Sequence, residues 1–136
     1  MSDPRTTRRN VSVDYARAVT SDSGCCGGPV PKGVVAKIAG YTDEDFAVLP
    51  NEAVLNSFGC GNPLAFLAVQ SGQVVLDLGP GAGIDLLLAA RKVGPSGRAI
   101  GVDMTDEMIA KANENIAAAG LANAEVRKGI IEDLPV

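Results

Sequence analysis

The chain has 136 residues, of which 46% are hydrophobic, so it is long enough to bury one core. Its net charge of −4 and the absence of histidine disfavour a nucleic-acid partner, because no basic field is available. The sequence contains neither a secretory signal segment nor an apolar run that could span a bilayer, so we expect a cytoplasmic protein without a membrane partner.

Residues 1–70 form the first of two expected regions, in which short helices are broken by Gly and Pro. The pattern predicts a helix over residues 11–19, capped by Asn10. We interpret Arg5, Arg8 and Arg9 upstream as a solvated tail.

Two further helices are predicted in this region. One begins at Thr42, where Asp45 replaces the usual Glu of a capping box. The other has Asn62 as cap and Pro63 as first residue, and runs through Val69.

Residues 71–136 form the second region, which alternates strands and helices. The pattern predicts strands over residues 73–78, 98–102 and 124–128, and helices over residues 82–93 and 106–119. Gly94-Pro95 stops the first helix, whereas Thr105 caps the second and Gly120 ends it. This order indicates an α/β fold built on a right-handed parallel βαβαβ unit.

A glycine-rich turn follows the first strand and starts at Asp77. Gly79, Gly81 and Gly83 place backbone N–H groups at the start of a helix, where a nucleotide-like ligand can bind. The spacing is not that of a dinucleotide fingerprint, because the third glycine comes one residue early. It is not a P-loop either, because no Gly-Lys-Ser/Thr follows.

A second acidic residue supports a ligand site. Asp103 ends the next strand, 20 residues after Gly83, where a carboxylate can accept hydrogen bonds from both hydroxyls of a ribose. The alternative is a glycine-rich turn that binds nothing.

The three cysteines are Cys25, Cys26 and Cys60. Zinc fits them poorly, because the chain has no histidine and no C-x-x-C pair. Three soft thiolates suit a thiophilic, three-coordinate element better. The alternatives are a buried, small hydrophobic role for Cys60 and an incidental exposed pair for Cys25 and Cys26.

These features together resemble the N-terminal part of arsenite methyltransferases, which are class I enzymes dependent on S-adenosylmethionine. The resemblance covers nearly the whole chain and rests on Cys25-Cys26, Gly40-Tyr41-Thr42, Gly59-Cys60-Gly61-Asn62-Pro63, residues 75–85, residues 90–94, residues 101–105 and residues 131–135. It implies a Rossmann-like fold with a parallel sheet.

The resemblance also implies roles for individual residues. Cys60, with Cys25 and Cys26, would hold trivalent arsenic while its lone pair attacks the methyl group of the cofactor, so no general base is needed. Asp77 would steer the methionine end of S-adenosylmethionine, and Met104 would pack against its adenine. The expected cofactor residues are Asp77, Gly79, Gly81, Gly83, Asp103, Met104, Ile131 and Glu132.

Two departures qualify the resemblance. The family has further arsenic-binding cysteines beyond the strand that should follow Pro135, whereas this chain stops at Val136. We therefore expect a sheet that is incomplete at its C-terminal side and a chain that is inactive alone. Related enzymes often carry an acidic residue at the position of Ile130, so Glu132 or backbone groups must bind the adenine amino group here.

The incomplete sheet has a further consequence. In the resembled fold the strand over residues 73–78 is central, and its apolar run suits a strand covered on both faces. Without its neighbour it becomes an exposed edge, which we expect to pair with a second copy, to be covered by the N-terminal segment or to aggregate.

The leading hypothesis is a methyltransferase that acts on trivalent arsenic, in arsenic detoxification. The alternatives are a class I methyltransferase for another small molecule and a non-catalytic thiol module that binds arsenite without a cofactor.

Overall fold

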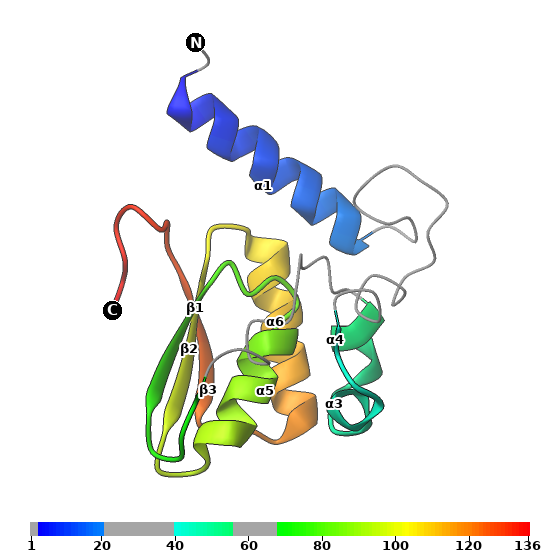
Figure 1. Cartoon of the computed structure of the whole chain (residues 1–136). Coiled ribbons are helices and arrows are strands. Elements are labelled where there is room, and N and C mark those ends of the chain that lie inside the picture. The colour runs from blue at the N-terminus through cyan, green and yellow to red at the C-terminus, as the bar shows by residue number, and fades with distance from the viewer. Residues whose placement is uncertain (1–2, 21–39, 56–67) are drawn as a thin grey trace.

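The computed structural model describes residues 3–20, 40–55 and 68–136. Its centre is a three-stranded parallel sheet with the order β1-β2-β3 (Figure 1). Two helices, α5 and α6, connect the strands. The bounds are Val74–Leu78 for β1, Ile84–Val93 for α5, Arg98–Asp103 for β2, Asp106–Ala119 for α6 and Ala124–Lys128 for β3. The predicted α/β alternation is thus confirmed.

The predicted helix ends agree with the structure to within two residues. Gly94 and Gly120 follow the last residues of α5 and α6, and Gly120 adopts a φ of 66° in a left-handed C-cap. Helix α5 begins at Ile84 instead of the predicted residue 82, because Gly83 has a φ of 92°, which is outside the right-handed helical region. Thr105 precedes α6, but its side chain makes no capping hydrogen bond.

The core lies between α5 and the sheet. Val75, Ala99 and Ala124 are in register on the three strands and therefore face the same side. Leu86 and Leu87 of α5 are fully buried in this cluster. Burial of a leucine side chain contributes about 1.5–3 kcal/mol, so these two residues fix α5 on the sheet.

The other face of β1 is open. Val74, Leu76 and Leu78 are 65%, 40% and 50% exposed, and β1 is an edge strand of the described sheet. The expected exposed apolar edge is therefore present in the structure.

The N-terminal helix α1 extends over Pro4–Thr20, so the prediction of a helix over residues 11–19 with Asn10 as cap was too short. Asp3 explains the earlier start, because its Oδ1 accepts a hydrogen bond from the Arg5 backbone N–H at 3.2 Å and Pro4 suits the first helical position. The expected solvated arginine tail is therefore part of a helix. Figure 1 shows α1 lying across the end of the sheet where the carboxyl ends of the strands meet.

Two short helices, α3 (Asp43–Ala47) and α4 (Asn51–Leu55), follow. The predicted capping box is confirmed, because Thr42 Oγ1 accepts from the Asp45 N–H at 3.2 Å and Asp45 Oδ2 accepts from the Thr42 N–H at 2.9 Å. The sequence did not predict α4. Lys111 of α6 forms an ion pair with Glu52 at 3.1 Å, which ties α4 to α6.

The helix predicted to run from residue 62 through residue 69 lies mostly outside the described residues. Its expected end is wrong, because Ala68 and Val69 are not helical. Within the described ranges, none of the helices combines the length and the apolar character that crossing a membrane requires.

One buried side chain connects α6 to the glycine-rich turn. The Asn115 amide donates a hydrogen bond to the Ala82 carbonyl oxygen at 2.9 Å, and Asn115 is almost completely buried. A buried amide needs such a partner, so this bond holds the turn against the helix.

Candidate functional site

A cavity of about 320 Å³ lies at the carboxyl ends of the strands. Four segments form it: the turn after β1, the junction of β2 with α6, the segment after β3, and α1. Its lining residues are Arg8, Val11, Tyr15, Gly79, Gly81, Val102, Asp103, Met104, Thr105, Met108, Gly129, Ile130, Ile131 and Glu132. Carboxyl ends of parallel strands are the usual place for a ligand in such a fold.

The glycine-rich turn supplies open backbone to this cavity. Gly79 and Gly81 have φ values of 77° and 56°, and a Cβ atom added to either would meet nothing within 4 Å. The Gly79 N–H donates to the Val102 carbonyl oxygen at 2.9 Å, which fixes the turn to β2. A ligand can therefore approach the backbone here without a side chain in its way.

Gly83 has a different position from the other two glycines. It lies outside the cavity lining and stands before α5, where an added Cβ would lie 3.5 Å from the Cβ of Ala112 in α6. In the described structure, Gly83 thus serves the close approach of the turn to α6.

Asp103 presents its carboxylate at the cavity wall. Its Oδ1 accepts a hydrogen bond from the Thr105 backbone N–H at 2.9 Å, and its carbonyl oxygen accepts from the Gly129 N–H at 2.9 Å. These two bonds fix the side chain and join the ends of β2 and β3. The position is suitable for accepting hydrogen bonds from a sugar.

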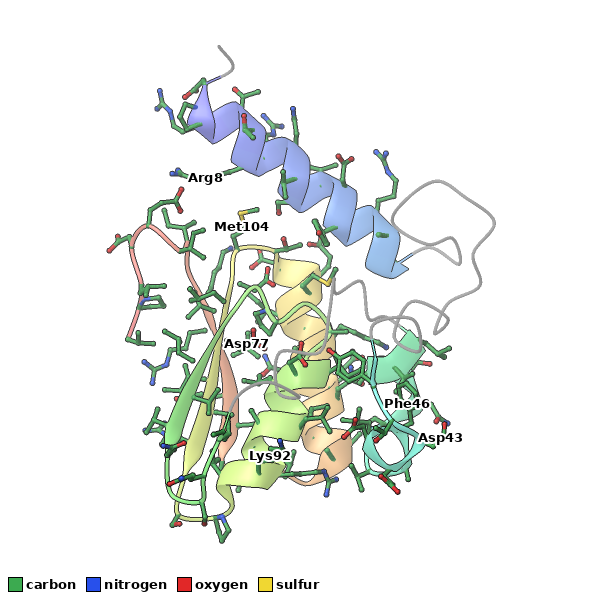
Figure 2. All side chains as sticks on the ribbon, viewed as in Figure 1. Arg8, Asp43, Phe46, Asp77, Lys92 and Met104 are labelled. Atoms are coloured by element: carbon green, nitrogen blue, oxygen red, sulfur yellow. The ribbon has the colours of Figure 1, made fainter. Side chains whose placement is uncertain are left out.

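The wall beside Asp103 is apolar. Val102, Met104, Met108, Ile130 and Ile131 all line the cavity. Figure 2 shows Met104 between the sheet and α1. Flexible methionine side chains on such a wall can adapt to a flat aromatic ring.

Helix α1 also forms part of the cavity wall, which the sequence analysis did not predict. Arg8, Val11 and Tyr15 line the cavity from above. The Arg8 guanidinium donates to Glu132 Oε1 from Nη2 at 2.8 Å and from Nε at 3.2 Å, which lowers the pKa of Glu132. The spacing of these three residues by three and four positions places them on one helix face and is a signal that could have identified them.

A second group of polar side chains surrounds the end of β1. Asp77 is half-buried, and its Oδ2 atom is buried with no hydrogen-bond partner among the described residues. Burial, the charge of Asp85 and the charge of Asp103 raise the pKa of Asp77 to about 7. Asp77 itself does not line the cavity.

Tyr41 and Asp85 complete this second group. The Tyr41 hydroxyl donates to Asp85 Oδ1 at 2.7 Å. Burial raises the pKa of Asp85, against the opposing effect of this hydrogen bond, and burial followed by the bond to Asp85 raises the pKa of Tyr41. Tyr41 is therefore a neutral donor at physiological pH.

The structure thus brings six of the eight expected cofactor residues into one cavity: Gly79, Gly81, Asp103, Met104, Ile131 and Glu132. Asp77 and Gly83 adjoin it through the turn without lining it. The expected thiol site cannot be compared in the same way, because Cys25, Cys26 and Cys60 lie outside the described residues. Among the residues that are described, no cluster of three His, Cys, Asp or Glu could hold a metal ion.

Comparison with known proteins gives a consistent result. The family model of a methyltransferase domain matches residues 69–136. An arsenite methyltransferase of Halobacterium salinarum is 44% identical over 147 residues, covering 98% of this chain and 37% of that protein. An arsenite methyltransferase of Aquipseudomonas alcaligenes is 46% identical over 81 residues, covering 57% of this chain and 23% of that protein. The chain therefore spans well under half the length of these two relatives.

Two solved structures resemble the fold. An S-adenosylmethionine-dependent methyltransferase from Aquifex aeolicus has a TM-score of 0.51 and 27% identity, covering 76% of this chain and 49% of that chain. CrArsM, an arsenic(III) S-adenosylmethionine methyltransferase from Chlamydomonas reinhardtii, has a TM-score of 0.50 and 34% identity, covering 77% of this chain and 34% of that chain.

Proposed function

The chain belongs to the methyltransferase domain family, and from this premise we propose that it binds S-adenosylmethionine in the cavity at the strand ends and serves methyl transfer to trivalent arsenic. The observation that carries the cofactor assignment is the combination of an open glycine backbone, a fixed carboxylate and an apolar wall around one cavity.

The described residues fit this cofactor in three places. Asp103 can accept hydrogen bonds from the ribose hydroxyls, and the wall around Met104 and Met108 can pack against the adenine. The buried Asp77 Oδ2, which has no described partner, suits the ammonium group at the methionine end. Glu132 lines the cavity, but because Arg8 occupies its Oε1, its proposed contact with the adenine amino group needs the other oxygen.

Methyl transfer from this cofactor requires little general acid or base catalysis from the protein. When bound, S-adenosylmethionine supplies a methyl group on a positively charged sulfur, and the electron pair of the broken C–S bond stays on that sulfur. The chain's own groups bind and orient the cofactor, exclude water and hold the acceptor. No proton has to be removed from an acceptor that attacks through a lone pair.

The arsenic part of the proposal rests on the sequence. The arsenite methyltransferase of Halobacterium salinarum aligns with 98% of this chain, and soft thiolates are suitable ligands for a thiophilic element. Cys60, together with Cys25 or Cys26, is the proposed arsenic-binding set.

Two measurements test the proposal. Calorimetric titration of the purified chain with S-adenosylmethionine should give saturable binding at one site, and absence of binding would contradict the cofactor assignment. Titration of the reduced chain with arsenite, followed by intact mass, should give one arsenic atom per chain, bound with loss of free thiols.

The outcomes of these measurements separate the alternatives. Cofactor binding without arsenite binding favours methyl transfer to another small molecule. Arsenite binding without cofactor binding favours a non-catalytic thiol module.

A further inference from the structure

A loop after β3 supplies several of the residues that line the cavity. Residues 129–135 belong to none of the described helices or named strands, and we call them the 129–135 loop. Gly129, Ile130, Ile131 and Glu132 of this loop all line the cavity. In Figure 1 the loop is the red segment that rises from β3 towards α1 and turns back. Its conformation therefore determines one side of the proposed cofactor site.

The two ends of the 129–135 loop meet. A Cβ added to Gly129 would lie 2.7 Å from Cδ of Pro135, so the proline ring lies directly against the backbone at the start of the loop. Between these ends, the Asp133 N–H donates to the Ile130 carbonyl oxygen at 3.1 Å and closes a tight turn. The segment is thus a closed loop, although it has no regular secondary structure.

Arg127 of β3 fixes this closure. Its Nη1 donates to the Pro135 carbonyl oxygen at 2.8 Å, and its Nη2 donates to Glu125 Oε1 at 2.8 Å. Glu125 Oε1 also accepts from Nη2 of Arg98 at 2.6 Å. A charged donor that is held by a carboxylate on its own strand therefore joins the end of the loop to the sheet. Arg127 itself does not line the cavity.

Arg8 holds the same loop at Glu132. Both of its hydrogen bonds, at 2.8 and 3.2 Å, go to Oε1, so Arg8 does not use the second carboxylate oxygen. The bonds from Arg8, followed by a bond from the Glu132 backbone N–H, lower the pKa of Glu132, and its side chain is ionised at neutral pH. An ionised carboxylate can only accept hydrogen bonds. At the cavity wall it favours an amino group and disfavours a carbonyl oxygen.

We propose that Arg8 and Arg127 hold the 129–135 loop from two sides and thereby make the cofactor site select a 6-aminopurine over a 6-oxopurine. Both arginines are positioning residues in this proposal, and Glu132 is the group that meets the base. The inference rests on the proposed function and adds the source of its base selectivity. No covalent bond changes in this step.

Selectivity of this kind depends on a fixed carboxylate. A site that hydrogen-bonds one ligand rejects its analogue only if the unmatched polar group cannot move away. A free loop would let Glu132 turn from a 6-oxo group into solvent, and the penalty for the wrong base would disappear. The Arg8–Glu132 pair is exposed and contributes little stability alone, but Arg127 restrains the same loop at its other end. Together they restrict where the carboxylate can point.

The test compares two ligands by calorimetric titration of the whole chain. S-adenosylhomocysteine has an amino group at C6 of the purine, whereas S-inosylhomocysteine has an oxo group there. The wild-type chain should prefer S-adenosylhomocysteine by roughly ten- to a hundredfold, as expected for one hydrogen bond to a charged acceptor. Absence of any preference in the wild type would overturn the proposal.

The Arg127→Met variant removes the bond to Pro135. The ratio of the two dissociation constants should fall by roughly three- to tenfold, because a loop that is no longer ordered must be ordered on binding. An unchanged ratio would overturn the proposal. A purely structural role of Arg127 would weaken both ligands equally and would also leave the ratio unchanged.

Two further variants make this result specific. Arg98→Met is the matched control, because Arg98 donates to the same oxygen of Glu125 but lies at the other end of the row from the loop. It should keep the wild-type ratio. Arg127→Lys retains one charged donor for the Pro135 carbonyl oxygen and should restore most of the ratio, which also keeps the test valid if Arg127→Met folds poorly. A loss of selectivity in Arg98→Met as large as in Arg127→Met would overturn the proposal.

A double-variant cycle shows whether the two arginines act through the same loop. Arg8→Ala and Arg127→Met should reduce the ratio by less in combination than the product of their single effects, because either change already releases Glu132. In a Glu132→Gln background, neither change should alter the ratio further. Independent effects of the two arginines, or effects that persist in Glu132→Gln, would overturn the inference. Absence of binding of both ligands to the wild type would instead overturn the proposed function, and with it this inference.

Discussion

The Arg8 guanidinium and the Glu132 carboxylate form a two-point ion pair across 124 residues of sequence, with distances of 2.8 and 3.2 Å. Arg8 belongs to α1, and Glu132 follows the last strand. Both residues line the same cavity. The pair therefore connects the roof of the proposed cofactor site to its wall.

Loss of this pair should affect ligand release more than folding. The pair is exposed to solvent, and exposed ion pairs contribute little stability, so Arg8→Ala should leave the thermal midpoint nearly unchanged. The roof should open more often, and S-adenosylhomocysteine should dissociate roughly two- to fivefold faster. Stopped-flow displacement measures this rate. The exchanged pair Arg8→Glu with Glu132→Arg should restore it, and a double variant as fast as Arg8→Ala would contradict this role.

Removal of the Asp103 carboxylate should weaken cofactor binding strongly. Hydrogen bonds to a charged acceptor contribute about 1.5–3 kcal/mol, so Asp103→Ala should weaken S-adenosylmethionine binding by roughly ten- to a hundredfold. Asp103→Asn retains an oxygen for the Thr105 N–H and should lose less affinity. Calorimetry gives both values, and an unchanged affinity for Asp103→Ala would refute the ribose assignment.

The glycine-rich turn can be tested with a matched pair of substitutions. Gly81 and Gly120 have φ values of 56° and 66°, and an added Cβ would meet nothing within 4 Å at either position. Alanine should therefore destabilise each variant by a similar amount, about 1–2 kcal/mol, because of the left-handed backbone. Only Gly81→Ala should also weaken cofactor binding, because only Gly81 lines the cavity. Equal affinities of the two variants would place the cofactor elsewhere.

Cys60 should be required for arsenite binding. Serine keeps the size of the side chain but provides a hard oxygen in place of a soft thiolate, so Cys60→Ser should lose most arsenite binding by intact mass. Binding of S-adenosylmethionine should stay close to that of the wild type. Wild-type arsenite binding by Cys60→Ser would assign the arsenic to other groups.

The exposed β1 edge should promote self-association. Val74, Leu76 and Leu78 present an apolar surface on β1, which is an edge strand of the described sheet, and no charged residue precedes Asp77 in this strand. We expect concentration-dependent dimers or larger species in light scattering, and Val74→Lys should shift them towards monomer. Val13→Lys, on an exposed position of α1, is the control and should have no effect. A wild-type chain that stays monomeric at high concentration would contradict this expectation.

Local signals explain why the second half of the fold was predictable. Gly94 and Gly120 end α5 and α6, and β1 and β2 contain short apolar runs that lead into turns. The same signals placed Asp103 and Met104 at one strand end, next to the glycine-rich turn. Each of these features depends on neighbours within a few residues.

The missed features depend on residues far apart in the sequence. The Tyr41 hydroxyl meets Asp85 across 44 residues, and Arg8 meets Glu132 across 124. Periodicity and capping carry no information on such pairs. The start of α1, in contrast, is predictable from local sequence, because Asp3 and Pro4 form a recognisable helix start. The interpretation of the three arginines as a solvated tail did not take this signal into account.

The hydrogen bond from Asn115 to the Ala82 carbonyl oxygen joins α6 to the glycine-rich turn. Helix α6 also carries Met108, which forms part of the cavity wall, and it lies close to the turn at a second place, where Ala112 faces Gly83. A displacement of α6 that opens the apolar wall must either pull the turn with it or leave a buried amide without a partner. The glycine-rich turn and the apolar wall of the proposed cofactor site are thus joined through α6.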